Sequence, residues 1–285
     1  METITASRVR SILPRRDPAG HKGDFGKLLC VCGSVGYTGA PVFASRAAVR
    51  TGAGLVFLAV PEQAWPVVAV KSEEAMPFPL PETAEGRLSL LAEEPIRQRA
   101  ASCDAVLIGC GLGRDRQTDA LVRKLLDIDR PLVLDADGLN ALDGCPEQLQ
   151  RRTAPTVLTP HEGEFLRLGG DLSRGREAAA AAFSRKYGVY LVLKGHRTLV
   201  ADPEGRLAVN ETGNSGMAKG GSGDVLGGLM VSLLGQGMEP LEAAAAAVWI
   251  HGRAGDLIAE RDGRRGMSTT DVLMEGIPAV LKGLE

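Results

Sequence analysis

Short apolar runs recur along the chain, and each is closed by a glycine, an aspartate or a proline. They occupy residues 27–32, 55–60, 105–108, 131–134, 156–158 and 189–193. Polar residues do not alternate with apolar ones inside these runs, which is typical of strands in a parallel sheet covered on both faces. We therefore expect these segments to form the centre of the molecule.

Segments with helical spacing lie between these runs. They cover residues 40–51, 115–126, 177–187 and 242–260, of which the last is the longest. Strands that alternate with helices predict a doubly wound α/β fold with a mostly parallel sheet. In such folds the active site lies at the carboxyl ends of the strands. The residues that close the apolar runs are therefore expected around one crevice.

The composition is that of an ordinary globular protein. Of the 285 residues, 44% are hydrophobic and 24% are charged, and the formal net charge is −2. No linker, low-complexity tract or internal repeat divides the chain, so we favour one domain. The amino terminus lacks the apolar core of a signal peptide, and the purest apolar run, 243–250, is too short to cross a bilayer. We predict a cytoplasmic protein without nucleic-acid or membrane partners.

The five cysteines do not form the pattern of a disulfide framework, because their number is odd and the chain is long. Reduced thiols are therefore expected. Cys30 and Cys32 lie in the first apolar run with one residue between them. We expect their side chains to point to opposite faces of that strand.

The segment 213–228, GNSGMAKGGSGDVLGG, carries the strongest chemical signal. Gly220, Gly221, Ser222 and Gly223 stand directly before Asp224 and an apolar run that predicts a buried helix. Glycines at a helix entrance leave backbone N–H groups bare, and the helix dipole adds positive charge there, so the segment predicts a phosphate cradle. A carboxylate at this position suits a general base. The alternative is a turn in which Asp224 only caps the helix.

Other strand ends also carry candidate groups. The loop 33–40 leads into a helix near Ala40, and 109–113 contains three glycines, more than a turn needs. Asp135 and Asp137 follow another strand and could orient a hydroxyl or a hydrated magnesium ion, or form a turn with a helix cap.

Two further loops carry basic or metal-binding residue types. His161 and Glu164 would share a face if a helix starts there, which fits substrate contact by His161 and a water-mediated metal contact by Glu164. The segment 194–198, with Lys194, His196 and Arg197, could meet nucleotide phosphates, or be a solvated hairpin turn bent at Gly195. His21 and His251 are interpreted as structural.

Taken together, these motifs resemble those of the ADP-dependent NAD(P)H-hydrate dehydratases, repair enzymes of the ribokinase superfamily. The resemblance runs from about His21 to near the carboxyl terminus. It is carried by residues 21–26, 33–40, 50–56, 109–113, 135–142, 158–165, 194–195 and 213–228. It implies a three-layer αβα ribokinase-like fold in one domain, 21–285, after an extension of residues 1–20. The epimerase domain that often accompanies this family is not expected in this chain.

The resemblance also implies an activity and a set of site residues. The family dehydrates the S-epimer of hydrated NADH or NADPH, which carries a hydroxyl on C6, at the expense of ADP, giving AMP and phosphate. By resemblance, Asp224 is the base, and the N–H groups of residues 220–223 hold the developing charge. The implied substrate contacts are Ala40, Gly111, Gly113, His161 and Asp224. The implied nucleotide contacts are Lys194, Gly195, His196, Arg197, Thr198 and Gly223. The resemblance further implies Mg²⁺ and a homo-oligomer such as a tetramer.

Two other functions remain open at this stage. A small-molecule kinase of the same superfamily would use the same cradle and Asp224 but release a phosphorylated product. A non-catalytic nucleotide sensor would bind without turnover. The chain departs from the usual family pattern at Ser215 and Lys219, where the family has proline and threonine, and at Cys110, where it has proline.

Overall fold

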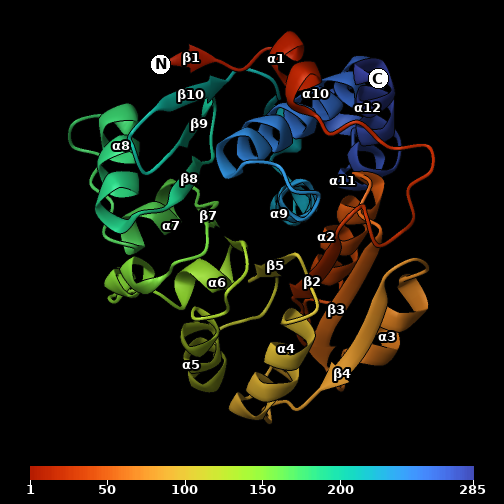
Figure 1. The fold of residues 1–285 in the computed structure, drawn as a ribbon, viewed down its shortest axis with the longest axis vertical. Coiled ribbons are helices and arrows are strands. Elements are labelled where there is room, and N and C mark those ends of the chain that lie inside the picture. Colours follow the sequence, from red (N-terminus) through yellow and green to blue (C-terminus); the bar gives the residue numbers. More distant parts are fainter.

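The apolar runs lie side by side in one ten-stranded sheet, as shown by the computed structural model, which describes all residues 1–285 (Figure 1). From one edge to the other, the strands are β1 (Glu2–Thr3), β10 (Leu207–Asn210), β9 (Thr198–Ala201), β8 (Tyr190–Leu193), β7 (Thr156–Leu158), β6 (Leu132–Leu134), β5 (Ala105–Ile108), β2 (Lys27–Val31), β3 (Leu55–Pro61) and β4 (Met76–Leu80). The seven strands from β8 to β4 are all parallel. Only β9 runs antiparallel to its neighbours.

Helices cover both faces of this sheet. One layer contains α1 (Ala6–Ile12), α2 (Gly39–Arg50), α3 (Trp65–Lys71), α9 (Ser222–Gly235), α10 (Pro240–Gly266) and, near the carboxyl terminus, α11 (Thr269–Asp271), the π-helical turn Val272–Gly276 and α12 (Ile277–Leu284). The other contains α4 (Glu93–Ala100), α5 (Arg116–Leu125), α6 (Asp137–Asn140), α7 (Glu162–Arg167) and α8 (Arg176–Tyr187). Short 3₁₀ turns occupy Leu90–Ala92, Pro146–Arg151 and Ser215–Met217. The predicted three-layer fold with a mostly parallel sheet is confirmed.

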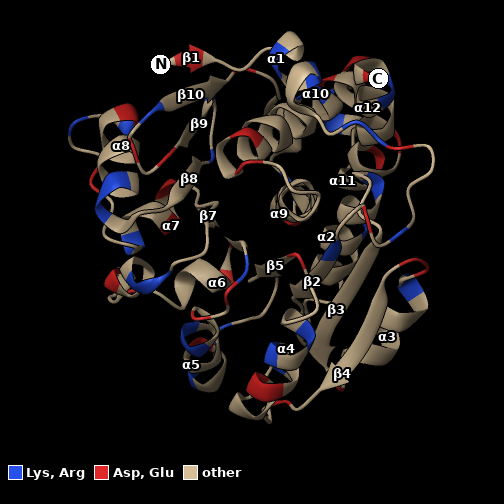
Figure 2. Cartoon of the chain, in the orientation of Figure 1, with Lys and Arg blue, Asp and Glu red and all other residues tan.

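The strands divide the core into two apolar clusters because successive side chains point to opposite faces of a sheet. Leu28, Cys30 and Cys32 belong to the cluster beneath α2, α9 and α10, whereas Leu29 and Val31 belong to the other cluster. The prediction that Cys30 and Cys32 point to opposite faces is therefore wrong, since residues two apart in a strand share a face. Charged residues lie mostly on helices and loops, while the central strands carry few (Figure 2).

The amino-terminal residues pack against the rest of the structure. The strand β1 pairs with β10, and α1 lies against α10. Ile4 and Val9 are buried in the core, and Arg8 donates two hydrogen bonds to the Glu242 carboxylate. None of the helices combines the length and apolar character needed to cross a bilayer.

Candidate active site

The entrance of α9 presents free backbone donors. The N–H groups of Gly220, Gly221, Gly223 and Asp224 donate no hydrogen bond within the protein. Gly221 is the N-cap residue with a φ of +88°, a conformation that glycine adopts without strain. A Cβ atom added at Gly220 would meet no atom within 4 Å, so this side of the turn is open. Free N–H groups at the start of a 14-residue helix are suited to hold an anion.

Asp224 lies in the first turn of α9, and it does not cap the helix. The N-cap is Gly221, and no side chain forms a cap hydrogen bond there. A carboxylate oxygen of Asp224, one of Asp135 and the Cys110 sulfur all lie within 4.8 Å of one another. Burial, and then the negative charge of Asp135, raises the pKa of Asp224 to about 6, although Cys110 and Lys194 act in the opposite direction. Such a pKa is suited to a base near neutral pH.

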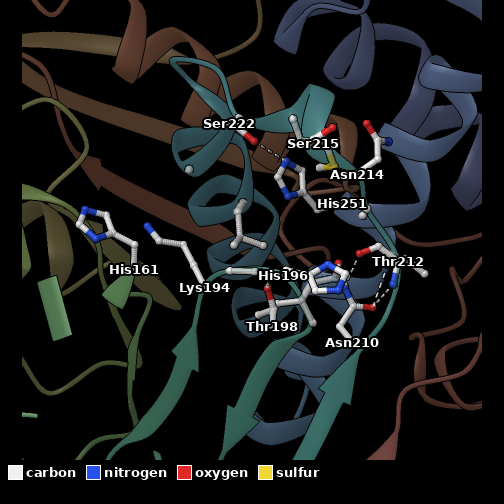
Figure 3. Close-up of a pocket in the computed structure, with 18 of the residues that line it drawn as sticks. His161, Lys194, His196, Thr198, Asn210, Thr212, Asn214, Ser215, Ser222 and His251 are labelled. Atoms are coloured by element: carbon white, nitrogen blue, oxygen red, sulfur yellow. Dashed lines mark hydrogen bonds between the residues drawn. The ribbon is translucent and has the colours of Figure 1, made fainter. Parts of the chain in front are cut away.

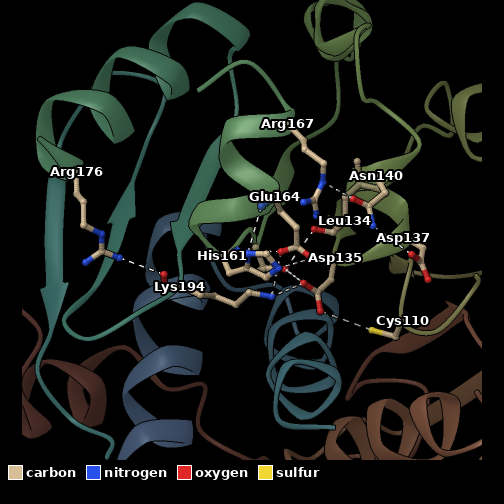
Figure 4. A network of polar contacts seen from close by, with 11 residues as sticks. Cys110, Leu134, Asp135, Asp137, Asn140, His161, Glu164, Arg167, Arg176 and Lys194 are labelled. Atoms are coloured by element: carbon tan, nitrogen blue, oxygen red, sulfur yellow. Dashed lines mark hydrogen bonds and ion pairs between the residues drawn. The ribbon is translucent and has the colours of Figure 1, made fainter. Parts of the chain in front are cut away.

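Asp135, the neighbour of this carboxylate, forms an ion pair with Lys194. Figure 4 shows the pair. The Lys194 ammonium at the end of β8 donates to Oδ1 of Asp135 over 2.8 Å and lies 3.7 Å from Oε2 of Glu164. The hydroxyl of Thr159 donates to the same Asp135 oxygen over 2.8 Å. Burial lowers the pKa of Lys194, but the two carboxylates raise it more, so the ammonium stays charged. A Cβ atom on Gly223 would lie 3.6 Å from the Lys194 ammonium, which places this charge beside the phosphate cradle.

The two aspartates after β6 are held by different partners. Oδ2 of Asp137 accepts a hydrogen bond from the Gly113 N–H over 2.8 Å, and its Oδ1 accepts one from Asn140. Ala136 between the aspartates has a φ of +48°, which is strained for a residue with a Cβ atom. This strained turn directs Asp135 to Lys194 and Asp137 to the loop 109–113. Asp137 is the first residue of the short helix α6, whose N-cap is Ala136 and has no side-chain cap hydrogen bond, so neither aspartate caps this helix.

His161 and Glu164 form a reciprocal cap at the start of α7 (Figure 4). The Glu164 N–H donates to Nδ1 of His161, and the His161 N–H donates to Oε2 of Glu164 over 2.8 Å. The predicted helix therefore starts where expected, and the His161 side chain remains 55% exposed. Glu164 is buried, and its Oε2 also faces Lys194. Direct coordination of a metal by Glu164 would disturb this cap, whereas a contact through water would not.

A cavity of about 970 Å³ opens beside the cradle (Figure 3). Its walls come from His161 at the N-cap of α7, the turn after β8, the segment after β10, and helices α9 and α10. Of the residues predicted to bind a nucleotide, substrate or phosphate, it is lined by His161, Lys194, Gly195, His196, Arg197, Thr198, Gly220, Ser222 and Gly223. The structure thus brings the predicted nucleotide segment and most of the cradle to one cavity.

The segment 194–198 is both a hairpin turn and a cavity wall. It joins β8 to the antiparallel β9, and it turns through Gly195 and Arg197, whose φ values are +151° and +59°. The Arg197 guanidinium pairs with Glu211 over 2.9 Å, and the Lys194 ammonium faces Asp135. The hairpin alternative is therefore correct as a description of the backbone. Nucleotide contact by these residues stays a prediction.

His251 was interpreted as structural, but it also lines the cavity. It belongs to α10, is 8% exposed, and its Nε2 lies 3.5 Å from the Ser222 hydroxyl (Figure 3). Burial lowers the pKa of His251 to about 4, with a smaller contribution from Lys194, so the ring is neutral near pH 7. The sequence signal was weak, because a single histidine after an alanine-rich helical run is typical of a core position.

The remaining predicted substrate residues lie around a second group of loops. A Cβ atom on Gly111 would lie 2.7 Å from the Ala40 Cβ, so Ala40 and Gly111 are in contact, and the Ser34 hydroxyl donates to the Gly111 carbonyl. Gly109, Gly111 and Gly113 all have positive φ, which gives each a conformational reason to be glycine. Ala40, Gly111 and Gly113 do not line the large cavity, and their contact with a substrate stays a prediction.

Comparisons with known proteins point to one family. The sequence model of the NAD(P)H-hydrate dehydratase family matches residues 28–278. A bifunctional NAD(P)H-hydrate repair enzyme from Moorella thermoacetica is 46% identical over 99% of this chain and 54% of its own length. An ADP-dependent (S)-NAD(P)H-hydrate dehydratase from Neisseria meningitidis is 40% identical over 91% of this chain and 86% of its own length.

A solved structure supports the same relationship. The ADP/ATP-dependent NAD(P)H-hydrate dehydratase from Bacillus subtilis, co-crystallised with ATP and Mg²⁺, is 30% identical and superposes with a TM-score of 0.83 over 100% of this chain and 99% of its own. The chain spans about half the length of the bifunctional relatives that it matches. The chain belongs to the NAD(P)H-hydrate dehydratase family and has its ribokinase-like fold.

Proposed function

We propose that this protein dehydrates the S-epimer of hydrated NADH and NADPH to NADH and NADPH at the expense of ADP, giving AMP and phosphate. Family membership supports the substrate class. The observation that carries the proposal is the position of Asp224, a half-buried carboxylate with a raised pKa directly beside free N–H groups at the start of α9. A base beside an anion site is suited to activate a hydroxyl for attack on a phosphate.

The first step transfers a phosphoryl group. Asp224 takes the proton of the C6 hydroxyl while the hydroxyl oxygen bonds to the terminal phosphorus of ADP, and the bond from that phosphorus to the bridging oxygen breaks, releasing AMP. The free N–H groups of Gly220, Gly221 and Gly223 stabilise the charge that develops on the phosphoryl oxygens. The Lys194 ammonium adds positive charge at the same place.

The second step removes the new phosphate ester. Hydroxide is a poor leaving group, but phosphate is a good one. The lone pair of the ring nitrogen expels phosphate from C6, and loss of a proton from C5 then gives the dihydropyridine. The oxygen of the hydrate leaves in the inorganic phosphate, so the reaction yields NADH or NADPH, AMP, phosphate and one proton.

The two substrates occupy different parts of this site in our proposal. ADP lies in the large cavity against residues 194–198 and Gly223. The nicotinamide ring lies between Asp224 and His161, on the side of Ala40, Gly111 and Gly113. Mg²⁺ would be held by the ADP phosphates, with Glu164 in contact through water, and would neutralise phosphate charge during transfer.

The test is incubation with hydrated NADH or hydrated NADPH and either ADP or ATP, following the absorbance of the restored dihydronicotinamide. We expect turnover with either nucleotide, a faster rate with ADP than with ATP, and AMP as the product of ADP. A product that keeps the oxygen as a phosphate ester would instead indicate a small-molecule kinase. Nucleotide binding without turnover would indicate a sensor.

The family resemblance also leads us to propose a homo-oligomer, such as a tetramer, that works in the cytoplasm. Light scattering on the purified protein measures its mass, and fractionation of cells locates it. A monomer in solution would contradict the first part of this proposal, and recovery outside the cytoplasm would contradict the second.

A further inference from the structure

Three buried polar side-chain atoms lie close together in the turn that follows β4. This turn is a tight hairpin in which the Thr83 N–H donates to the Arg87 carbonyl and Glu82 pairs with Leu88. Thr83 and Ser89 are 7% and 4% exposed, yet neither hydroxyl has a hydrogen-bond partner within the protein. The buried Nε of Arg87 has none either. Buried polar atoms are seldom left unpaired, so three in seven residues suggest a missing partner.

The hairpin geometry places these three side chains on one face. Thr83 and Arg87 are directly opposite each other across the turn, and Ser89 follows Arg87 by two residues, so all three share a face. The other face carries Leu88, which is fully buried in the apolar core. The polar face is therefore the one turned away from that core.

The Arg87 guanidinium lies against the loop 109–113. A Cβ atom on Gly113 would lie 2.3 Å from Nε of Arg87, so the two residues are in close contact. No carboxylate pairs with this guanidinium, whose one weak contact is the Glu85 carbonyl at 3.5 Å. The same turn touches the loop 33–40, because Val35 packs on Gly86 and donates its N–H to the Gly86 carbonyl. Arg87 thus lies where the two predicted substrate loops meet.

The loop 110–113 connects this cation to the proposed base. The Cys110 sulfur lies within 4.8 Å of the Asp224 carboxylate, and Gly113 is three residues further along. Three residues span at most about 11 Å. A dinucleotide whose nicotinamide ring lies at Asp224 would therefore place a phosphate within reach of Arg87. Arginine is well suited to this role, because its planar guanidinium binds phosphate through paired hydrogen bonds.

We propose that Arg87, assisted by the hydroxyls of Thr83 and Ser89, binds a phosphate group of the hydrated dinucleotide. The proposal rests on the proposed function for the identity of the substrate. The phosphate belongs either to the pyrophosphate, which both dinucleotides carry, or to the 2′-phosphate of the NADPH form. This site is separate from the cavity assigned to ADP, since Arg87 does not line that cavity.

The test measures Arg87→Gln, which removes the charge but keeps a polar side chain of similar length. We expect the KM for the hydrate to rise about 10-fold or more, as for loss of a hydrogen bond to a charged group, while the KM for ADP stays unchanged. An equal rise for hydrated NADH and hydrated NADPH assigns the contact to the pyrophosphate. A rise for hydrated NADPH alone assigns it to the 2′-phosphate. Arg116→Gln, which removes an exposed arginine at the start of α5, should change neither KM.

Binding measurements separate this proposal from the proposed function. Calorimetric titration with NADH and NADPH, the expected products, should show weaker binding to Arg87→Gln whether or not the wild-type protein turns over a hydrate. Thr83→Val should weaken binding without lowering Tm, because its hydroxyl has no partner to lose within the protein. Unchanged KM and Kd values in both variants would overturn the proposal. Absent turnover with weakened binding would overturn only the proposed function.

Discussion

The carboxylates of Asp224, on α9, and Asp135, at the end of β6, lie within 4.8 Å of each other. The Lys194 ammonium lies beside them and pairs with Asp135. Lys194 bonds to Asp135 over 2.8 Å, so one carboxylate of the two is neutralised directly and the other is not. Two carboxylates in different environments are suited to different roles. This difference fits our proposal, in which Asp135 holds the lysine in place and Asp224 exchanges a proton.

Replacement of Asp224 by asparagine tests this division of roles. Asp224→Asn keeps the shape of the side chain but cannot accept the proton, so kcat should fall about 10²–10⁴-fold. Binding of ADP should persist because the free N–H groups of α9 remain. Calorimetry for ADP and steady-state kinetics for turnover measure the two properties. Retention of more than about a tenth of wild-type kcat, with chemistry rate-limiting, would require another base.

The pH dependence of turnover reports the ionisation of Asp224. Because its pKa is raised to about 6, kcat/KM should fall as the pH drops through 6 and the carboxylate takes up a proton. Asp135→Asn removes a negative charge that raises this pKa, and it frees Lys194 to lower the pKa further. The other groups that face Asp224 are Cys110, whose raised pKa keeps its thiol neutral, and Asp137. The midpoint should therefore move to lower pH in the variant.

A stability measurement gives an independent check of the same pKa. A carboxyl group whose pKa is raised by folding stabilises the native state most when it is protonated, and this contribution is lost as the pH rises from 3.8 through 6. Asp224→Asn should consequently have a higher Tm than wild type at pH 8 and a similar Tm at pH 4. A midpoint of kcat/KM that stays at pH 6 in Asp135→Asn, or an unchanged Tm at pH 8 in Asp224→Asn, would contradict this account.

The parts of the site that could be predicted from sequence are those encoded locally. The glycines of 220–223 and the apolar run behind Asp224 are contiguous, so the helix entrance and its free N–H groups follow from the local pattern. The central strands could likewise be predicted, because a strand buried on both faces is an uninterrupted apolar run that is visible in the local sequence.

The parts that were missed depend on contacts between distant segments. Lys194 and Asp135 are 59 residues apart, and nothing local indicates that they pair. The positive φ of Ala136 could not be predicted either, because alanine seldom adopts it. It arises where the backbone joins Asp135 and Asp137, which are held by different partners. His251 reaches the cavity only because α10 packs beside α9. The strands β9 and β10 are four residues each, too short for a clear periodic pattern.

A pair of variants can separate the helix-capping role of His161 from its proposed contact with the substrate. It caps α7 and lines the cavity, so His161→Ala should lose about 0.5–2 kcal/mol of stability as well as any substrate contact. His161→Asn provides a side chain that caps helices well but lacks the imidazole ring. We expect the asparagine variant to keep its Tm and to show a raised KM for the hydrate. A normal KM with a normal Tm would show that His161 acts only as the cap.

We expect substitutions of Lys194 and Asp135 to have non-additive effects on the free energy of unfolding. Lys194→Met leaves the carboxylate of Asp135, which is 3% exposed, without its cation, and removal of one partner of a buried pair costs about 3–5 kcal/mol. The double variant Lys194→Met with Asp135→Asn also removes the unpaired carboxylate of Asp135 and leaves only that of Glu164 without the lysine, so its free energy of unfolding should be higher than that of Lys194→Met alone. Urea unfolding of the wild type, both single variants and the double variant measures the coupling. Lys282→Met, at an exposed position of α12, is the matched control and should change stability by no more than about 0.5 kcal/mol. If the two single effects simply add, Lys194 and Asp135 are not coupled, and the ion pair does not hold Asp135 in place.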